Sequence, residues 1–211
     1  NNLKKIREMN FFTSLKITDE DVLKTKQYQQ QAKRSRLSKV FNNTEDFFKS
    51  LDINITIRES DKFSIPRISQ LTMKTNQFNL TTKRYKESDI HKFYKDPNSH
   101  VYYLSVKDNI GDYGIVGVFI GFAIDEKIII DIFLMSCRVI GREIENAFLA
   151  QVINSLSKKG FKKIEGEYIQ SKRNSLVKDF YKNLGFKMVG NFWILELPYE
   201  IKVPHWIDIS E

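Results

Sequence analysis

The sequence predicts an α+β (mixed α/β) fold, with a central, mostly antiparallel sheet flanked by helices and preceded by a helical arm. Three observations lead to this expectation. Apolar residues such as Leu3, Ile6 and Met9 recur at helical spacing near the start of the chain. From residue 78, alternating or continuous apolar runs follow one another directly, which predicts hairpins. After residue 143, helical and strand patterns alternate, which predicts strand–helix–strand crossovers.

Length and charge narrow the class of protein. The chain has 211 residues and a formal net charge of +8 at pH 7, which predicts one domain, with or without an appendage. The positive charge favours acidic partners: nucleic acid, an anionic membrane, a phosphorylated ligand or an acidic protein. The single cysteine excludes an internal disulfide, and the sequence has no signal-peptide or membrane-spanning pattern. We therefore expect a cytoplasmic protein with no membrane partner.

Residues 1–60 are expected to form a helical connector or arm, and residues 61–211 the folded domain. Thr18 and Thr44 each precede acidic residues, a pattern typical of helix N-termini. Between them the chain is polar and basic, with cations that include Lys33, Arg34 and Arg36. These cations fit either a nucleic-acid contact or a solvated helix face, and the low apolar density favours the solvated face.

Each element of the folded domain has its own local signal. Period-two or continuous apolar runs predict strands at 78–85, 101–108, 115–125, 127–136, 161–169 and 187–197, and a strand or extended link at 53–57. Helical patterns predict helices that begin near Pro66 and that span 86–96, 143–158 and 174–186. Gly160 and Gly185 are suited to end the last two helices.

The stretch FLMSCRVIGREIENAFL, residues 133–149, joins a predicted strand to the longest helix of the domain. Gly141 permits a close backbone approach. The amides that open a helix are unpaired donors at the positive end of its dipole. The stretch can therefore hold a phosphate, or it can be a strand-to-helix corner without a ligand.

Two motifs in this order of elements resemble the GNAT acyltransferase superfamily. Its phosphate-binding loop, Arg/Gln-x-x-Gly-x-Gly/Ala, is similar to Arg138-Val139-Ile140-Gly141-Arg142-Glu143. Its Asn…Phe-Tyr-x-x-x-Gly-Phe pattern is similar to Asn174…Phe180-Tyr181-Lys182-Asn183-Leu184-Gly185-Phe186. The resemblance implies a GNAT-like fold that binds acyl-CoA or a phosphopantetheine thioester. It also implies that amides from Val139 to Ile144 hold the phosphate, that Arg138 or Arg142 adds a charged contact, and that Asn174 touches the pantetheine.

Glu143 departs from the GNAT pattern, which has glycine or alanine at this position. A carboxylate suits a helix N-terminus but repels a phosphate beside it. CoA carries a pyrophosphate and a further phosphate, whereas a carrier-protein arm carries one phosphodiester, so Glu143 should penalise CoA more. The departure favours a carrier protein, and the charge of +8 suits an acidic one.

A narrower resemblance covers nearly the whole chain. The stretches FFTSLKITDEDVLKTKQYQQQAKR, RISQLTMKTNQFNLTTKRY and SCRVIGREIE resemble the C-terminal part of FkbH-like proteins, in which a HAD-like domain precedes a GNAT-like domain. The HAD nucleophile motif, Asp-x-Asp-x-Thr, does not occur in the sequence, and the chain starts at Asn1 rather than at a methionine. We therefore expect the C-terminal portion of a longer protein with a HAD-like domain as partner. The resemblance implies transfer of a small acyl group, for example glyceryl, to or from the pantetheine thioester of an acyl carrier protein or CoA.

Several side chains are candidates for chemistry, each with a structural alternative. Cys137 lies where the resemblance places a thioester carbonyl, and positive neighbours favour its thiolate, so it is either an acyl-accepting nucleophile or a small buried residue. Tyr181 matches a tyrosine that often protonates the leaving thiolate in GNAT enzymes, or it fills the core. Glu167, which shares a strand face with Glu165, is either a general base or part of a solvated alternation. Asn174 fits helix capping as well as a pantetheine contact.

The remaining signals rank the functional hypotheses. Asn76 and Gln77, in the polar run KTNQFN, are candidates for substrate or interdomain contacts. The sequence has no metal-ligand cluster or Walker-type loop, so no metal is expected. An acyltransferase is the first hypothesis, and a non-catalytic module that docks a carrier protein for the HAD-like domain is the second. Nucleic-acid binding ranks last because it rests only on net charge and the basic arm.

Overall fold

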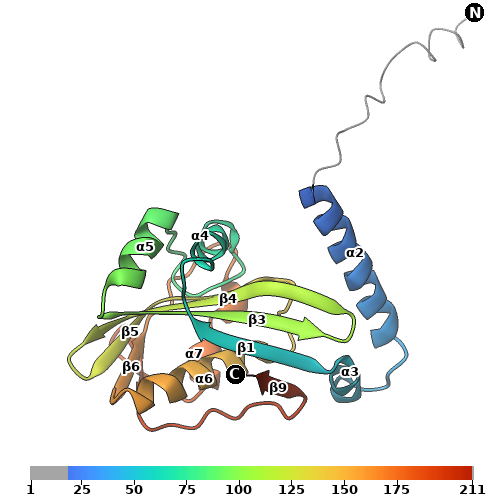
Figure 1. Cartoon of the computed structure of the whole chain (residues 1–211). Helices are drawn as coiled ribbons and strands as arrows, with labels where there is room; N and C mark the ends of the chain where they lie inside the picture. Colours follow the sequence, from blue (N-terminus) through green and yellow to red (C-terminus); the bar gives the residue numbers. More distant parts are fainter. Residues whose placement is uncertain (1–18, 211) are drawn as a thin grey trace, which may run out of the picture. The chain divides into compact units, whose positions relative to one another are not determined.

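The computed structural model describes residues 19–210, which fall into two compact units that divide between Asn42 and Asn43. In the first unit, α2 (Asp19–Ser38) forms a helical arm, as expected (Figure 1). The helical spacing around Leu3 and the cap expected at Thr18 lie outside the described residues. None of the described helices is both long and apolar enough to cross a membrane.

The second unit begins with α3 (Thr44–Leu51), and its N-cap is Asn43 rather than Thr44. The Asn43 side chain accepts a hydrogen bond from the Asp46 amide at 2.7 Å, which satisfies one of the open amides of the first turn. β1 (Ile53–Glu59) follows and pairs with two strands of the sheet. The folded unit therefore starts at Asn43, earlier than the boundary at residue 60 that the sequence suggested.

One mixed sheet forms the centre of this unit, with the strand order β7-β8-β6-β5-β4-β3-β1-β9. Its other strands are β3 (Ser99–Asp108), β4 (Gly111–Ile124), β5 (Lys127–Met135), β6 (Lys163–Gly166), β7 (Lys187–Val189), β8 (Phe192–Glu196) and β9 (Ile207–Ser210). Two pairs, β1–β9 and β5–β6, are parallel and the others are antiparallel within the described residues. β2 (Phe78–Asn79) pairs with β5 outside the main order.

Helices cover both faces of the sheet (Figure 1): α4 (Ile65–Lys74) and α5 (Glu87–Lys95) on one face, α6 (Ile144–Lys158) and α7 (Phe180–Asn183) on the other. On the α4 side, Ile132 and Leu134 of β5 belong to a fully buried cluster. On the α6 side, the ring of Phe133 stacks on Phe148 at 5.3 Å and on Phe180 at 5.0 Å. Because successive strand residues point to opposite faces, β5 supplies both cores.

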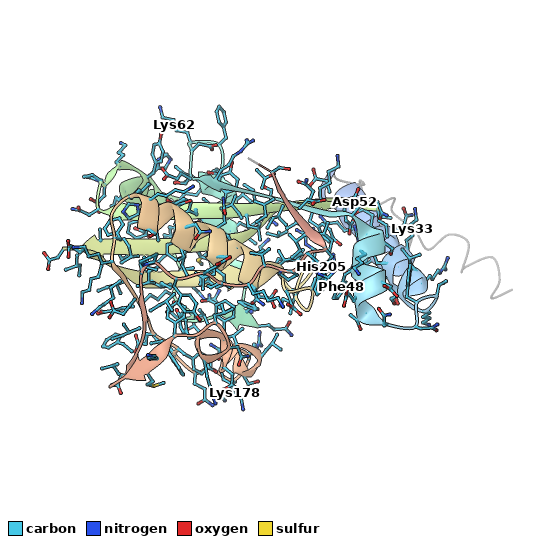
Figure 2. All side chains as sticks on the ribbon, turned by 90° about the horizontal axis from the view of Figure 1, so that it is seen from below. Lys33, Phe48, Asp52, Lys62, Lys178 and His205 are labelled. Carbon is cyan, nitrogen blue, oxygen red and sulfur yellow. The ribbon has the colours of Figure 1, made fainter. Side chains whose placement is uncertain are left out.

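The segment before β9 packs on α3. The Trp206 ring lies 5.6 Å from the Phe48 ring, and His205 Nε2 lies 3.1 Å from a carboxylate oxygen of Glu45. Phe48 and His205 are labelled at this end of the sheet in Figure 2. β9 was not predicted, because a four-residue strand near the end of the chain carries little periodic signal.

Three predicted elements are shorter than expected. The strand expected at 161–169 is confined to β6, Lys163–Gly166. The strand expected at 78–85 ends at Asn79, whose side-chain oxygen accepts a hydrogen bond from the Thr82 amide at 2.9 Å, while Thr82 adopts a left-handed φ of 59°. The helix expected at 174–186 is split into a 3₁₀ turn (Ser175–Val177) and α7. Asn174 bonds the backbone of the preceding loop instead of capping this segment.

Candidate active site

The residues between β5 and α6 form a tight corner rather than an open loop. The Val139 amide donates to the Ser136 carbonyl at 3.2 Å, and the Val139 side chain is fully buried. Gly141 has a φ of 83°, a left-handed value that glycine adopts without strain. Ile140 is half-buried, and Ile144, fully buried, opens α6. The corner is therefore anchored in the core at Val139 and Ile144.

Arg142 points into the molecule. Its guanidinium donates to the Tyr113 hydroxyl at 2.6 Å, lies 3.6 Å from Asp108 Oδ2, and sits 5.3 Å from the centre of the Tyr113 ring. Both Arg142 and Asp108 are buried. The side chain expected to contact a phosphate instead joins the start of α6 to the β3–β4 turn.

Two carboxylates lie at the N-terminus of α6. Glu143 precedes the helix with a left-handed φ of 60°, and Glu145 lies in its first turn. Glu145 Oε2 is buried and has no hydrogen-bond partner among the described residues. Burial, followed by the charge of Glu143, raises the pKa of Glu145. Trp206 donates its indole N–H to the Arg142 carbonyl at 3.3 Å, so the corner is also covered from the β9 side.

Cys137 is exposed and lines a cavity of about 810 Å³ between α4 and the end of β5. Five cationic side chains line the same cavity: Arg67, Lys74, Arg138, Lys172 and Arg173. Its neutral polar lining includes the predicted contacts Asn76 and Gln77, and none of its described lining residues carries a carboxylate. An anion is the ligand that this lining favours.

Two of the cations of this cavity are held in place by neighbouring backbone. Arg138 donates to the Tyr113 carbonyl at 3.1 Å, and Arg67 donates to the Ile115 carbonyl at 3.2 Å. Burial and then the charge of Arg138 lower the pKa of Arg67, as expected where like charges converge. Sequence reasoning missed four of these cations. Arg67 and Lys74 are seven residues apart on one face of α4, and this spacing could have been seen in the sequence. Their position on one cavity with Lys172 and Arg173 depends on the fold.

Tyr181 is fully buried and lies away from this cavity. Its ring packs directly against Gly166 of β6, where a larger residue would overlap the hydroxyl. The hydroxyl has no hydrogen-bond partner within the described part of the chain, and burial, followed by the charge of Glu167, raises the pKa of Tyr181. Glu165 forms an ion pair with Lys127 at 2.9 Å. The structure thus brings Tyr181 near Glu167, but neither lines the cavity of Cys137.

Asn174 lies between β2 and the loop that follows β6. Its amide donates to the carbonyls of Asn79 and Ile169, each at 2.9 Å, and its oxygen accepts from the Ser171 amide at 2.7 Å and the Tyr168 hydroxyl at 3.3 Å. The side chain is fully buried. Asn174 is therefore occupied by the protein's own backbone.

The arrangement of strands and helices matches solved acetyltransferases. The ribosomal-protein-S18-alanine N-acetyltransferase of Escherichia coli superposes with a TM-score of 0.53 at 13% identity, covering 72% of this chain and 97% of that protein. The chain has the GNAT acetyltransferase fold. A GNAT-family acetyltransferase from Staphylococcus aureus Mu50 gives a TM-score of 0.51 at 15% identity, over 68% and 99% of the two chains. A Salmonella typhimurium protein solved with its cofactor acetyl-CoA gives a TM-score of 0.51 at 15% identity, over 71% and 97%.

Sequence comparison adds no closer relationship. No protein-family model matches the chain, and the search of curated proteins returns no match. The similarity to the solved structures therefore establishes the GNAT fold alone, and the narrower FkbH-like relationship stays a prediction.

The start of α6 and the cavity at Cys137 differ in how well they suit an anion. The start of α6 does not suit a pyrophosphate, because Glu143 and Glu145 oppose it and Arg142 is turned inward. The cavity at Cys137 suits an anion, because five cations and no carboxylate line it. The described residues include no group of three or more His, Cys, Asp or Glu side chains that could hold a metal ion.

Proposed function

We propose that the chain transfers a small acyl group to or from the phosphopantetheine thioester of an acyl carrier protein, with Cys137 as a covalent relay. The observation that carries this proposal is an exposed thiol in a cavity lined by five cations and no carboxylate. The GNAT fold supports an acyl-transfer reaction, and the FkbH-like resemblance supports a carrier protein and a glyceryl group as the substrate.

The cavity suits a carrier-protein arm better than CoA. A phosphopantetheine arm brings one phosphodiester and a thioester, which match a cationic cavity beside a thiol. The start of α6, with Glu143 and Glu145, offers no site for the two further phosphate groups that CoA brings. The net charge of +8 also favours an acidic carrier protein as partner.

The chemical step is an exchange of one thioester for another. The thiolate of Cys137 attacks the carbonyl carbon and forms a new C–S bond, while the bond between that carbon and the sulfur of the arm breaks. The arm leaves as a thiolate and takes up the proton that Cys137 released. Arg138 and the other cations hold the phosphate, so the carbonyl is brought to the thiol. Transfer onward is the same exchange with an acceptor nucleophile in place of the arm.

Intact-protein mass spectrometry tests this proposal. The chain, Cys137→Ser and Cys137→Ala are each incubated with glyceryl and acetyl thioesters, presented on an acyl carrier protein and on CoA. We expect the mass of one acyl group on the native chain, formed faster from the carrier protein than from CoA, and no adduct on either variant. An adduct of equal size on Cys137→Ala would contradict the relay.

The second candidate function is a docking module without chemistry of its own. The buried Tyr181 hydroxyl favours this function, since the expected proton donor is out of reach of a ligand in the cavity. A docking module would bind phosphopantetheine and its carrier protein in the same cavity with no acyl adduct. Loss of carrier binding in Arg173→Ala, without any adduct on the native chain, would identify it.

A further inference from the structure

The sheet has a gap between β5 and β6 that the chain itself fills. The two strands are parallel and paired only from Lys127–Ile130 to Lys163–Gly166, whereas β5 continues for five more residues. An unpaired strand edge binds extended chains that carry amide groups. A pantetheine arm carries two amides, so an arm of this kind could pair with β5 along this edge.

β2 occupies this edge and bonds to both sides of the gap. Phe78 and Asn79 pair with Met135 and Leu134 of β5. The Leu80 amide then donates to the Phe133 carbonyl at 3.1 Å, and the Leu80 carbonyl accepts from the Ile169 amide at 2.8 Å. On the β6 side, Asn174 donates to the Asn79 carbonyl. The backbone groups that an extended ligand would use are therefore taken by residues 78–80.

The side chains of this segment are part of the core. Phe78 is 3% exposed, and Asn79 and Leu80 are fully buried. The Phe78 ring lies 5.3 Å from Phe180 and 6.0 Å from Phe133, edge-on to both. Removing the segment from the gap would expose two large apolar side chains and separate two buried asparagines.

The residues after β2 are fixed to β5 at a second point. Asp131 is buried; its backbone carbonyl accepts from the Thr81 hydroxyl at 2.6 Å. Its carboxylate accepts from the Tyr85 hydroxyl at 2.7 Å and pairs with Lys83 at 2.5 Å. The segment is thus held along β2 and again by the residues that follow it.

We infer that β2 is a permanent internal strand that takes the place of an extended ligand between β5 and β6, and that any thioester reaches Cys137 from the outer, cationic cavity. The second half of this inference rests on the proposed function; the first half does not. The ligand class that follows is a phosphopantetheine thioester whose arm lies along the outer surface of the cavity, not an arm threaded through the sheet.

Hydrogen exchange of the free chain tests the first half without any ligand. We expect the Leu80 and Ile169 amides to exchange within about tenfold of the core amides of Phe119 in β4 and Phe133 in β5, because β2 leaves only when the domain unfolds. Exchange more than about tenfold faster at Leu80 and Ile169 would show that β2 opens within the folded domain and would overturn the inference.

A matched pair of variants tests the second half. Leu80→Ala loosens the segment at residues 78–80 without changing the lining of the cavity, whereas Leu149→Ala removes an equal, fully buried side chain from α6. We expect both variants to acylate Cys137 at the native rate while they remain folded. A rate increase of about tenfold or more in Leu80→Ala alone would show that the arm needs the gap. Absence of an adduct in all three chains would refute the proposed function and the access route together, and would leave the exchange result to decide the role of β2.

Discussion

The substitution Asn174→Ala tests whether Asn174 has a structural role or a ligand-binding role. In Asn174→Ala, the buried carbonyl of Asn79 and the part-buried carbonyl of Ile169 each lose a donor, and the Ser171 amide loses its acceptor at 2.7 Å. A buried polar group left without its partner costs about 1–3 kcal/mol. With one buried group and two groups nearer solvent affected, we expect the free energy of unfolding to fall by about 2–4 kcal/mol, a large part of the stability of a domain of this size.

Urea denaturation followed by tryptophan fluorescence measures this loss, with Asn183→Ala as the matched control. Asn183 is exposed on α7, and its truncation should change the free energy of unfolding by less than about 0.5 kcal/mol. If Asn174 instead served to hold pantetheine, its truncation would weaken ligand binding and leave stability close to that of the control. A loss below about 1 kcal/mol in Asn174→Ala would refute the account of β2 as a strand fixed by buried asparagine.

Three further predictions concern the charges around the corner and the cavity. Arg142→Ala should lower the free energy of unfolding by about 3–5 kcal/mol, because it removes a buried cation that faces the Asp108 carboxylate and donates to the Tyr113 hydroxyl; urea denaturation measures this, and a change below about 1 kcal/mol would contradict it. Glu145→Gln should raise the melting temperature at pH 7. Because the pKa of Glu145 is raised by folding, the folded state keeps this proton to a higher pH than the unfolded state does. The free energy of unfolding of the native chain therefore falls as pH rises above the ordinary pKa of 4.5, and the advantage of the variant should vanish below that pH. Replacing Lys172 and Arg173 by serine should weaken phosphopantetheine binding about tenfold or more in calorimetry; an equal effect from replacing two exposed lysines elsewhere would assign it to net charge.

Local patterns were enough to predict most of the fold. The hairpin of β3 and β4, the buried β5 and the helix at 144–158 carry long, regular apolar signals, and the structure places them as expected. β2 was predicted too long because a local turn, in which the Asn79 side-chain oxygen accepts from the Thr82 amide, decides where it ends, and period-two alternation does not show such a turn. The expected boundary at residue 60 was late because β1 depends on partners more than 40 residues away.

The candidate site was only partly predictable. The sequence pointed to the stretch around Cys137, Asn76 and Gln77, and the structure places all three on one cavity. The direction of Arg142 could not be read from the motif, since its partner Asp108 lies on another strand. The filled gap beside β5 could not be foreseen either, because a two-residue strand has no signal of its own in the sequence.

The most direct test of the central claim is a peptide map of the chain after exposure to a glyceryl thioester on an acyl carrier protein. The account predicts one glyceryl group, located on the peptide that contains Cys137 and absent from Cys137→Ser. Acyl transfer that proceeds at the same rate in Cys137→Ser, with no modified peptide in the native chain, would contradict the relay. The cationic cavity would then have a binding role only.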